Sequence, residues 1–323
     1  MTPALHRVVC IVGATASGKT ELAERCALAW GSEVISVDAM QVYRGMDIGT
    51  AKQPVEQRRV PLRMVDVADP TQDYSVALFQ RAARAWVDGL CADGRMPVLC
   101  GGTGLYLDAT IDEMSFPEGE RGDERRAAWE AMAAEQGAEA LYELLRSRDE
   151  ASAALIHPHN LRRVIRALEL LDQGKSYAQH HEGLKRRAPH YDARIWAIAW
   201  PRETLYARID ARVDRMVADG LLDEVRGLRD LGLKADSTAG QAIGYAEMLQ
   251  VLEGGCALQD AIERTKTRTR RYAKRQLSWL RRDGRTRWLE PGAYGSWDEF
   301  CAHALRTMEQ DLAKAEGESD VRS

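Results

Sequence analysis

No apolar run in the 323 residues approaches the roughly 20 residues that a membrane-spanning helix needs. The first apolar segment, directly after Arg7, is five residues long, which is too short for a secretory signal peptide. Internal repeats and low-complexity tracts are also missing. These absences exclude a membrane protein and a repeat protein, and we expect a globular protein of the cytoplasm.

Cysteine is scarce, and the six cysteines show neither a CxxC pair nor a spacing typical of a metal site. Most of them lie among apolar residues, so we predict reduced thiols rather than a disulfide framework. A strong net charge is missing as well, since the formal value is −4. The overall charge therefore gives no sign of a nucleic-acid partner.

The local distribution of charge is less even than the total. Between Arg264 and Arg287 the chain has eleven Lys or Arg residues against one acid, Asp283. A second basic cluster consists of Arg162, Arg163 and Arg166. Either cluster alone is compatible with a solvated helix face. Two concentrated basic segments in a mildly acidic protein nevertheless favour a polyanion partner.

Strand-like apolar runs alternate with stretches of helical spacing over most of the chain. We predict strands at residues 7–12, 33–37, 63–67, 96–100, 195–200 and 286–290. We predict helices at residues 21–30, 76–93, 202–219 and 261–283, the second of them capped by Ser75. This alternation is typical of an α/β fold, with a parallel sheet and crossover helices as in P-loop NTPases.

One stretch interrupts this alternation. From about residue 123 to residue 174 the chain is charged, rich in alanine and helical in period, and a polar segment follows up to residue 191. A chain of 323 residues is also longer than a typical domain with one hydrophobic core. We therefore predict a P-loop α/β core over 1–115, an all-helical insertion over 116–191, and a return to the core with basic C-terminal helices over 192–323.

The most specific motif is a G-x-x-x-x-G-K-T loop between the first strand and the first helix. Its glycines allow backbone N–H groups to face phosphate oxygens, and the next helix directs its positive N-terminal end at them. Lys19 adds a charge, and the hydroxyl of Thr20 suits Mg²⁺. The loop consists of Gly13, Ala14, Thr15, Ala16, Ser17, Gly18, Lys19 and Thr20. It predicts a bound phosphate chain and leaves open whether the phosphates belong to a nucleotide.

Polar residues also follow two later strands of the predicted sheet. Asp38 comes directly after the second strand, where parallel sheets bind their ligands, and is suited to holding a metal, acting as a base or capping a helix. Ser36, Gln41 and Tyr43 surround it, and a Gln amide can pair with the edge of a base. Thr103 occupies the same position after the fourth strand, within Gly-Gly-Thr-Gly.

Seven segments resemble the tRNA dimethylallyltransferases, also known as the tRNA isopentenylpyrophosphate transferase family. They are the P-loop, ISVDAMQVYRGMDIGTAK (35–52), GGTGLY (101–106), RRVIRALE (162–169), RVDRM (212–216), IGY (243–245) and YAKRQLSWLR (272–281). They occur in order over roughly residues 8 to 290. The resemblance implies transfer of a dimethylallyl group from dimethylallyl diphosphate to the N6 amine of a tRNA adenosine beside the anticodon.

The resemblance also implies roles for single residues. The P-loop binds the diphosphate together with Mg²⁺, near the hydroxyl of Thr20. Asp38 takes the proton of the adenine amine, while Thr103 and Arg212 contact the diphosphate. Residues implied to contact tRNA are Asp38, Ala39, Met40, Gln41, Thr103, Arg126, Arg162, Arg163, Val164, Ile165, Arg166, Gln241, Ala242, Ile243, Gly244 and Tyr245. The expected partners are tRNA and dimethylallyl diphosphate, no membrane is expected, and we expect a monomer.

The chain departs from the family pattern at a few positions. Ala14 replaces a proline of the P-loop, and Ala39 replaces a serine, which removes a hydroxyl at an expected tRNA contact. The tRNA contact assigned to Arg126 suits Arg125 almost as well. A Cys/His pair is missing after Arg282, so the zinc finger of eukaryotic relatives is not expected and a bacterial type is implied.

Three other functions remain as alternatives. A P-loop kinase for a small molecule leaves the segments IGY and RRVIRALE without a role. An enzyme that prenylates free AMP or ADP does not require a helical insertion with an arginine cluster. An RNA-binding ATPase without group transfer has no need for Asp38.

Overall fold

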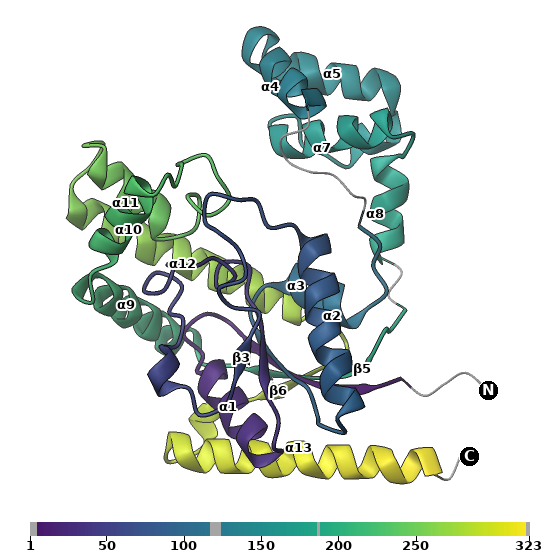
Figure 1. The fold of residues 1–323 in the computed structure, drawn as a ribbon, viewed down its shortest axis with the longest axis vertical. Coiled ribbons are helices and arrows are strands. Elements are labelled where there is room, and N and C mark those ends of the chain that lie inside the picture. Colours follow the sequence, from purple (N-terminus) through teal and green to yellow (C-terminus); the bar gives the residue numbers. More distant parts are fainter. Residues whose placement is uncertain (1–4, 117–123, 186–187, 321–323) are drawn as a thin grey trace. The chain divides into compact units, whose positions relative to one another are not determined.

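The computed structural model describes residues 5–116, 124–185 and 188–320. The chain divides into two compact units, one made of residues 1–111 and 190–323 and the other of residues 112–189 (Figure 1). We call them the α/β unit and the helical unit. The sequence predicts the insertion at 116–191, and the compact helical unit begins and ends a few residues earlier. Residue 123, where the helical stretch is predicted to begin, lies outside the described residues.

A six-stranded sheet forms the centre of the α/β unit, in the order β3-β2-β4-β1-β5-β6. All neighbouring strands pair in parallel. The strands are β1 (Arg7–Gly13), β2 (Val34–Val37), β3 (Leu62–Arg63), β4 (Val98–Gly101), β5 (Asp192–Ile198) and β6 (Thr286–Leu289). The predicted α/β fold with a parallel sheet is therefore confirmed.

The described residues of the α/β unit also form helices, some of which cover the two faces of the sheet. They are α1 (Lys19–Ala29), α2 (Val76–Ala92), α3 (Gly104–Ile111), α9 (Arg202–Ala218), α10 (Leu221–Asp230), α11 (Tyr245–Leu252), α12 (Leu258–Leu280) and α13 (Trp297–Asp320). Ser75 caps α2 as predicted, because its hydroxyl accepts a hydrogen bond from the backbone N–H of Leu78 at 3.2 Å. In the described part of the chain, none of the helices is long and apolar enough to cross a membrane.

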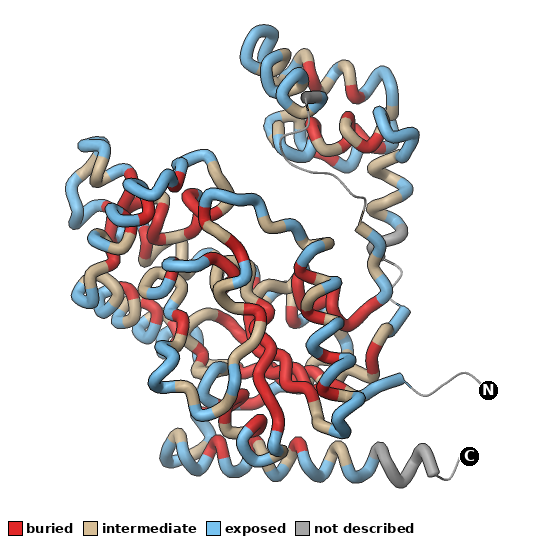
Figure 2. Tube along the Cα trace, in the orientation of Figure 1, coloured by how far each residue is buried: buried red, intermediate tan, exposed pale blue. Residues whose placement is uncertain are grey.

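Alternating side chains of β1 divide the interior of the α/β unit into two cores. Val8 and Cys10 face a core with residues of α2, α3 and α11, whereas Val9 and Ile11 face a core with residues of α1 and α13. This follows from the strand period of two residues. Both cores are buried at the centre of the unit (Figure 2). All six cysteines are free thiols, as predicted.

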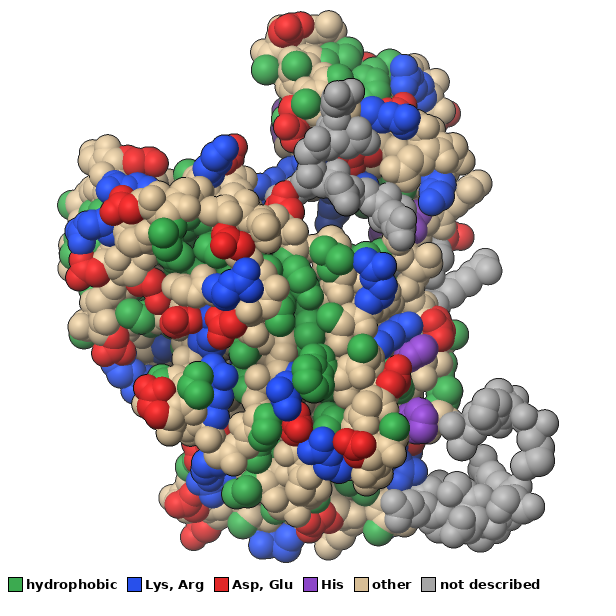
Figure 3. Space-filling model, viewed as in Figure 1, with side chains coloured by type: hydrophobic (Ala, Val, Ile, Leu, Met, Phe, Trp, Pro, Cys, Tyr) green, Lys and Arg blue, Asp and Glu red, His purple; other side chains and the backbone are tan. Residues whose placement is uncertain are grey.

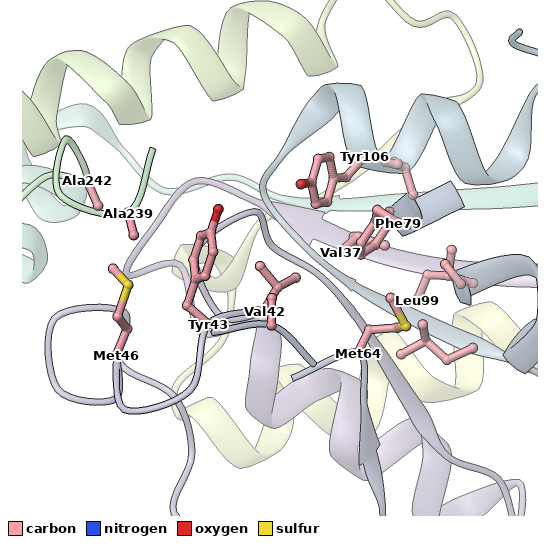
Figure 4. Packing of buried hydrophobic residues seen from close by; sticks show 14 of the residues in the cluster. Val37, Val42, Tyr43, Met46, Met64, Phe79, Leu99, Tyr106, Ala239 and Ala242 are labelled. Carbon is pink, nitrogen blue, oxygen red and sulfur yellow. The ribbon is translucent and has the colours of Figure 1, made fainter. Parts of the chain in front are cut away.

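The loop after β2 contributes its own side chains to the first core. Val42, Tyr43 and Met46 are buried there, and Figure 4 shows Val42 on the side of Val37 and Met64, and Met46 on the side of Ala239. A loop that buries large apolar side chains is constrained like a core element. The residues before and after these side chains therefore have defined positions at the edge of the sheet.

The predicted third strand at 63–67 is wrong in most of its length. Only Leu62 and Arg63 form a strand, because Met64 and Asp66 adopt positive φ values of 62° and 58°. A positive φ turns the backbone away from the extended conformation, so the ladder ends there. Residues 67 and 68 instead donate hydrogen bonds to the carbonyl oxygen of Val42, which attaches this segment to the loop after β2.

The described residues of the helical unit form five helices, which bury a small apolar core of their own. They are α4 (Glu124–Gln136), α5 (Ala138–Arg148), α6 (Glu150–Ala154), α7 (Leu161–Asp172) and α8 (Tyr177–Lys185). Leu141, Leu145, Val164 and Leu168 are fully buried in this core. The sequence predicts helices here, and within the polar segment 175–191 the structure adds α8.

Candidate active site

Three loops leave the same edge of the sheet side by side. In the strand order β2-β4-β1, both Val37 of β2 and Val12 of β1 are in register with Gly101 of β4. The residues that follow these positions are Asp38, Gly13 and Gly102. The sequence motifs at the ends of the three strands therefore meet at the carboxyl edge, where parallel α/β sheets bind their ligands.

The P-loop has a tight backbone and is supported from its outer side. Gly18 has a φ of 94°, and a Cβ atom at this position would lie 2.4 Å from the ring of Trp297. The Trp200 indole N–H donates to the carbonyl oxygen of Ser17 at 2.9 Å, and Arg208 donates to that of Ala16 at 2.8 Å. The two carbonyl groups therefore face these side chains, while the N–H of Thr15 is donated to Gln276 Oε1 and that of Ser17 to the carbonyl oxygen of Ala14.

Two cations and one carboxylate lie close together beside the P-loop. Burial lowers the pKa of Lys19, Arg212 lowers it further, and Cys100 and Asp38 oppose this effect. Burial likewise lowers the pKa of Arg212, and Asp38 again opposes it. Two partly buried cations near the carboxylate of Asp38 form a net positive site, which favours an anionic ligand.

Two buried hydrogen-bonding groups in this site have no partner in the described part of the chain. They are the hydroxyl of Ser17 within the P-loop and the Nε–H of Arg212. Buried polar groups almost always have a partner, and leaving one without costs about 1–3 kcal/mol. These two donors indicate that a ligand with acceptor oxygens completes the site.

Asp38 and Thr103 are joined through the backbone between them. Asp38 Oδ1 accepts hydrogen bonds from the N–H groups of Met40 at 2.9 Å and Gln41 at 3.4 Å. Thr103 Oγ1 accepts one from the N–H of Ala39 at 3.0 Å. The carboxylate is thus held in a turn, and its second oxygen remains available for chemistry.

The loop after β2 connects two further residues of the predicted site. The carbonyl oxygen of Thr50 accepts hydrogen bonds from Gln41 Nε2 at 3.3 Å and from Arg212 Nη2 at 3.4 Å. Ser36 donates to Gln41 Oε1 at 2.9 Å. The positions of Gln41 and Arg212 therefore depend on the conformation of this loop.

Glu224 of α10 holds the same loop by its backbone. Its Oε2 accepts from the N–H groups of Asp47 at 3.0 Å and Ile48 at 2.7 Å, and its Oε1 accepts from that of Gly49 at 3.1 Å. The hydroxyl of the buried Tyr245 donates to Glu224 Oε1 at 2.6 Å. One carboxylate thus organises three successive amide groups.

We predict that Glu224→Gln lowers the free energy of unfolding by about 1–3 kcal/mol, because an NH₂ group would face N–H donors that then lose their acceptor. Urea unfolding followed by circular dichroism measures this change. Glu253→Gln, at the exposed C-terminal end of α11, is the matched control and is expected to have no effect. Equal stability of the two variants would contradict the organising role.

Comparison with known protein families identifies the family of this chain. The family model described as IPP transferase matches residues 41–283, and the model described as isopentenyl transferase matches residues 6–63. The first match alone covers more than half of the chain. The chain belongs to the IPP transferase family. The resemblance in the sequence motifs is thereby confirmed.

Curated relatives match nearly the whole chain. The tRNA dimethylallyltransferase of Geobacillus kaustophilus is 46% identical over 287 residues, which cover 88% of this chain and 90% of the relative. That of Streptomyces griseus is 45% identical over 314 residues, which cover 96% and 99%. The relatives are thus similar in length as well as in sequence.

Solved structures of the family have the same fold. A tRNA isopentenylpyrophosphate transferase from Bacillus halodurans superposes with a TM-score of 0.73 at 38% identity, covering 98% of this chain and 99% of the other. A eukaryotic dimethylallyltransferase described as acting on tRNA gives a TM-score of 0.81 at 27% identity, covering 96% and 80%. The fold and the enzyme class of this IPP transferase are therefore shown.

Within the helical unit, the residues predicted to contact RNA differ in exposure. Arg162 and Arg163 are exposed at the start of α7, whereas the side chains of Val164 and Ile165 are buried in the core of the unit. Glu169 of α7 pairs with Arg126 at 3.1 Å and with Arg166 at 3.1 Å. The two exposed arginines are therefore the side chains of this group best placed to meet a phosphate backbone.

In the predicted segment 241–245, the structure separates one exposed side chain from buried ones. Gln241 is exposed, but Ala242 and Tyr245 are buried, and the hydroxyl of Tyr245 is bonded to Glu224. Burial also raises the pKa of Tyr245. In this conformation Tyr245 supports the loop after β2, and its predicted contact with RNA stays a prediction, as do those of Ile243 and Gly244.

The basic helix α12 is partly neutralised by its neighbours. Lys266 pairs with Asp214 at 2.7 Å, Arg270 pairs with Asp210 at 2.7 Å, and Arg268 pairs with Glu247. On the face drawn in Figure 3, acidic and basic side chains of the α/β unit are interspersed. Arg271 and Lys274 remain exposed, without a hydrogen bond or ion pair to other described residues.

Tyr272 is a site residue that the sequence motifs did not identify. Its hydroxyl lies near the side chains of Thr103 and Gln276, and burial and the nearby Asp38 raise its pKa to about 12. It lies 169 positions after Thr103 in the chain. The motif YAKRQLSWLR contains it, but the composition of the motif suggested a basic surface rather than a residue of the site.

Proposed function

We propose that this enzyme transfers the dimethylallyl group of dimethylallyl diphosphate to the N6 amine of the tRNA adenosine beside the anticodon. The observation that carries the proposal is a pair of buried donors without a partner among the described residues, Ser17 Oγ in the P-loop and Arg212 Nε on the side chain next to Asp38. Such a site suits an anionic leaving group next to a base. The relatives bearing the name tRNA dimethylallyltransferase support the same reaction.

The P-loop and two cations would bind the diphosphate of the donor. Trp200 and Arg208 hold the backbone of the loop, and Lys19 and Arg212 supply positive charge beside it. As the C–O bond of the allylic carbon breaks, its electron pair leaves with the diphosphate. Preorganised donors and cations stabilise this developing charge, while allylic delocalisation stabilises the carbon.

Asp38 would take the proton that the adenine amine loses. The N6 lone pair is delocalised into the ring, so the amine is a weak nucleophile, and removal of its proton as the C–N bond forms assists the attack. The turn with Met40 and Gln41 occupies Oδ1. The remaining oxygen of the carboxylate is the acceptor in this proposal.

A magnesium ion is part of this proposal as the companion of the diphosphate. In the described part of the chain, no three His, Cys, Asp or Glu side chains gather to hold a metal. The exposed hydroxyl of Thr20 on α1 fits Mg²⁺, which usually keeps few protein ligands and binds mainly phosphates and waters. When bound, Mg²⁺ neutralises part of the diphosphate charge.

The proposed macromolecular partner is tRNA, whose target adenosine must leave its stack to reach the site, at a cost of a few kcal/mol. The exposed Arg162 and Arg163 would bind phosphates of this RNA. In this proposal the diphosphate and the phosphate backbone of the RNA are bound by different side chains. The monomeric state and the cytoplasmic location stay predictions.

We predict that replacing Arg162 and Arg163 together by Ala weakens tRNA binding and lowers the salt slope of the binding constant by roughly two. The affinity for dimethylallyl diphosphate is expected to stay unchanged. Filter binding at several salt concentrations measures the slope. A matched control replaces Arg146 and Lys175, two exposed cations of the same unit, by Ala. An equal loss in both double variants would show a general charge effect instead of a specific contact.

The decisive experiment offers radiolabelled dimethylallyl diphosphate and Mg²⁺ to unmodified tRNA, to free AMP and to buffer alone. Label in tRNA is the expected result. Label in AMP alone would replace the proposal by an adenylate prenyltransferase. Absence of label in both, with hydrolysis of ATP in a parallel assay, would exclude prenyl transfer and favour a nucleotide-hydrolysing enzyme.

A further inference from the structure

One face of α12 lines the loops of the site, although its other face is basic. Tyr272, Gln276 and Trp279 are spaced by four and three positions, which places them on the same side of a helix. The side chain of Tyr272 lies near that of Thr103, and Trp279 Nε1 donates to Asp108 Oδ2 of α3 at 3.1 Å. This face of α12 therefore lies along the loop after β4 and along α3, the helix that comes after this loop.

Gln276 occupies the centre of this face and reaches two loops at once. Its Oε1 accepts a hydrogen bond from the backbone N–H of Thr15 in the P-loop at 2.9 Å. Its Nε2 donates to the carbonyl oxygen of Gly102 at 2.9 Å. The side chain is 6% exposed, so water does not compete strongly for either bond. A single buried amide thus spans the gap between the diphosphate loop and the loop of Thr103.

The glycine at position 102 gives room for this bridge. A Cβ atom there would lie 2.2 Å from Gln276 Nε2 and 3.1 Å from the carbonyl oxygen of Gly13. The close approach of the P-loop, Gly102 and Gln276 therefore requires glycine. Thr103, the next residue, accepts the N–H of Ala39 beside Asp38. The bridge is consequently one residue away from the group that holds the turn of the proposed base.

We propose that Gln276 is a positioning residue that sets the distance between the bound diphosphate and the adenine amine. The inference rests on the proposed function, because it assigns the diphosphate to the P-loop and the amine to Asp38. The amide touches neither substrate and acts through Thr15 on one side and Gly102 on the other. Gln is suited to this position because its amide carries an acceptor oxygen for the N–H of Thr15 and a separate NH₂ donor for the carbonyl oxygen of Gly102.

Loss of the bridge is expected to affect the chemical step more than the binding of either substrate. Each loop keeps its own ligand contacts, whereas the alignment between donor carbon and nitrogen deteriorates. A misplacement of about 1 Å can lower a rate by roughly 100-fold. A rate change with little change in KM therefore distinguishes positioning from simple loss of structure.

The test compares Gln276→Met, which keeps the length of the side chain and removes both hydrogen bonds, with the natural enzyme in single-turnover prenyl transfer to tRNA. We expect the rate to fall by about 10-fold to 100-fold, with both KM values changed by less than about threefold. Gln276→Glu, a second variant that retains the acceptor for Thr15, is expected to lose rate and also to bind the diphosphate less tightly. Gln250→Met, at an exposed position of α11, is the control and is expected to match the natural enzyme.

A double-mutant cycle with Thr103→Val completes the test. If Gln276 acts through the loop of Thr103, the rate penalty of Gln276→Met is smaller in the Thr103→Val background than in the natural enzyme. Additive penalties, or a natural transfer rate in a folded Gln276→Met, would overturn the inference. If Gln276→Met does not fold, the same cycle is carried out with Gln276→Glu. Absence of transfer by the natural enzyme would instead refute the proposed function, so the two failures are distinguishable.

Discussion

Asp38→Asn is expected to lower the rate of prenyl transfer by about 10²–10⁴-fold, the usual contribution of a positioned general base. The amide oxygen of Asn can still accept the N–H groups of Met40 and Gln41, so the turn around position 38 is retained. What the variant loses is the charge and the ability to take a proton. Single-turnover transfer to tRNA measures the loss directly.

The control for Asp38→Asn is Asp219→Asn, at the exposed C-terminal end of α9. The binding of both substrates to Asp38→Asn is expected to remain within about threefold of the natural enzyme. A transfer rate reduced by no more than the control would assign the proton to another acceptor. A large loss of tRNA affinity with an unchanged single-turnover rate would make Asp38 a binding residue instead.

The sequence predicted those parts of the site that are local in the chain. The P-loop, Asp38 and Thr103 each come at the end of a strand. In the sequence, such a strand end is visible where an apolar run stops at a polar or glycine-rich turn. The parallel arrangement then brings the three turns to one edge without further information. The motif order alone was enough to place the chain in a family.

Other parts were not predictable, because they depend on tertiary contacts or on which side of a helix a residue lies. The strand expected at 63–67 has a β-like composition, but two positive φ values end it after Arg63. Val164 and Ile165 are in the same string as the exposed Arg162 and Arg163, yet they pack into the core of the helical unit. The sequence motif alone does not show which of its residues are buried.

The residues that support the site from distant parts of the chain are the ones that sequence motifs predict least well. Glu224, Tyr272 and Gln276 reach the loops from α10 and α12, far along the chain from the residues they contact. Glu, Tyr and Gln also occur on the exposed faces of helices, so their residue types alone do not mark them as part of a site. Their role in holding the loops follows only from contacts that the fold creates. This explains why all three were absent from the predicted site.

Arg212→Gln is the second substitution with a large expected effect. We predict a fall of about 10²–10³-fold in kcat, because the variant removes a cation from the charge that develops on the leaving diphosphate. Gln can still donate to the carbonyl oxygen of Thr50, which limits the damage to the loop after β2. Steady-state kinetics with the diphosphate as the varied substrate measures the effect.

Two comparisons separate the charge of Arg212 from its geometry. Arg212→Lys keeps a cation without the planar fork, so partial activity in this variant would assign most of the effect to charge. Arg215→Gln removes an exposed cation of the same helix and is expected to change kcat little. The Nε–H of Arg212 is buried and without a partner in the described chain. Since an unpaired buried donor is costly, this group gains when an acceptor oxygen arrives, and because the proposed acceptor is the diphosphate, we expect the penalty of Arg212→Gln to appear with the diphosphate rather than with tRNA. An increase in the KM for tRNA alone would contradict that assignment.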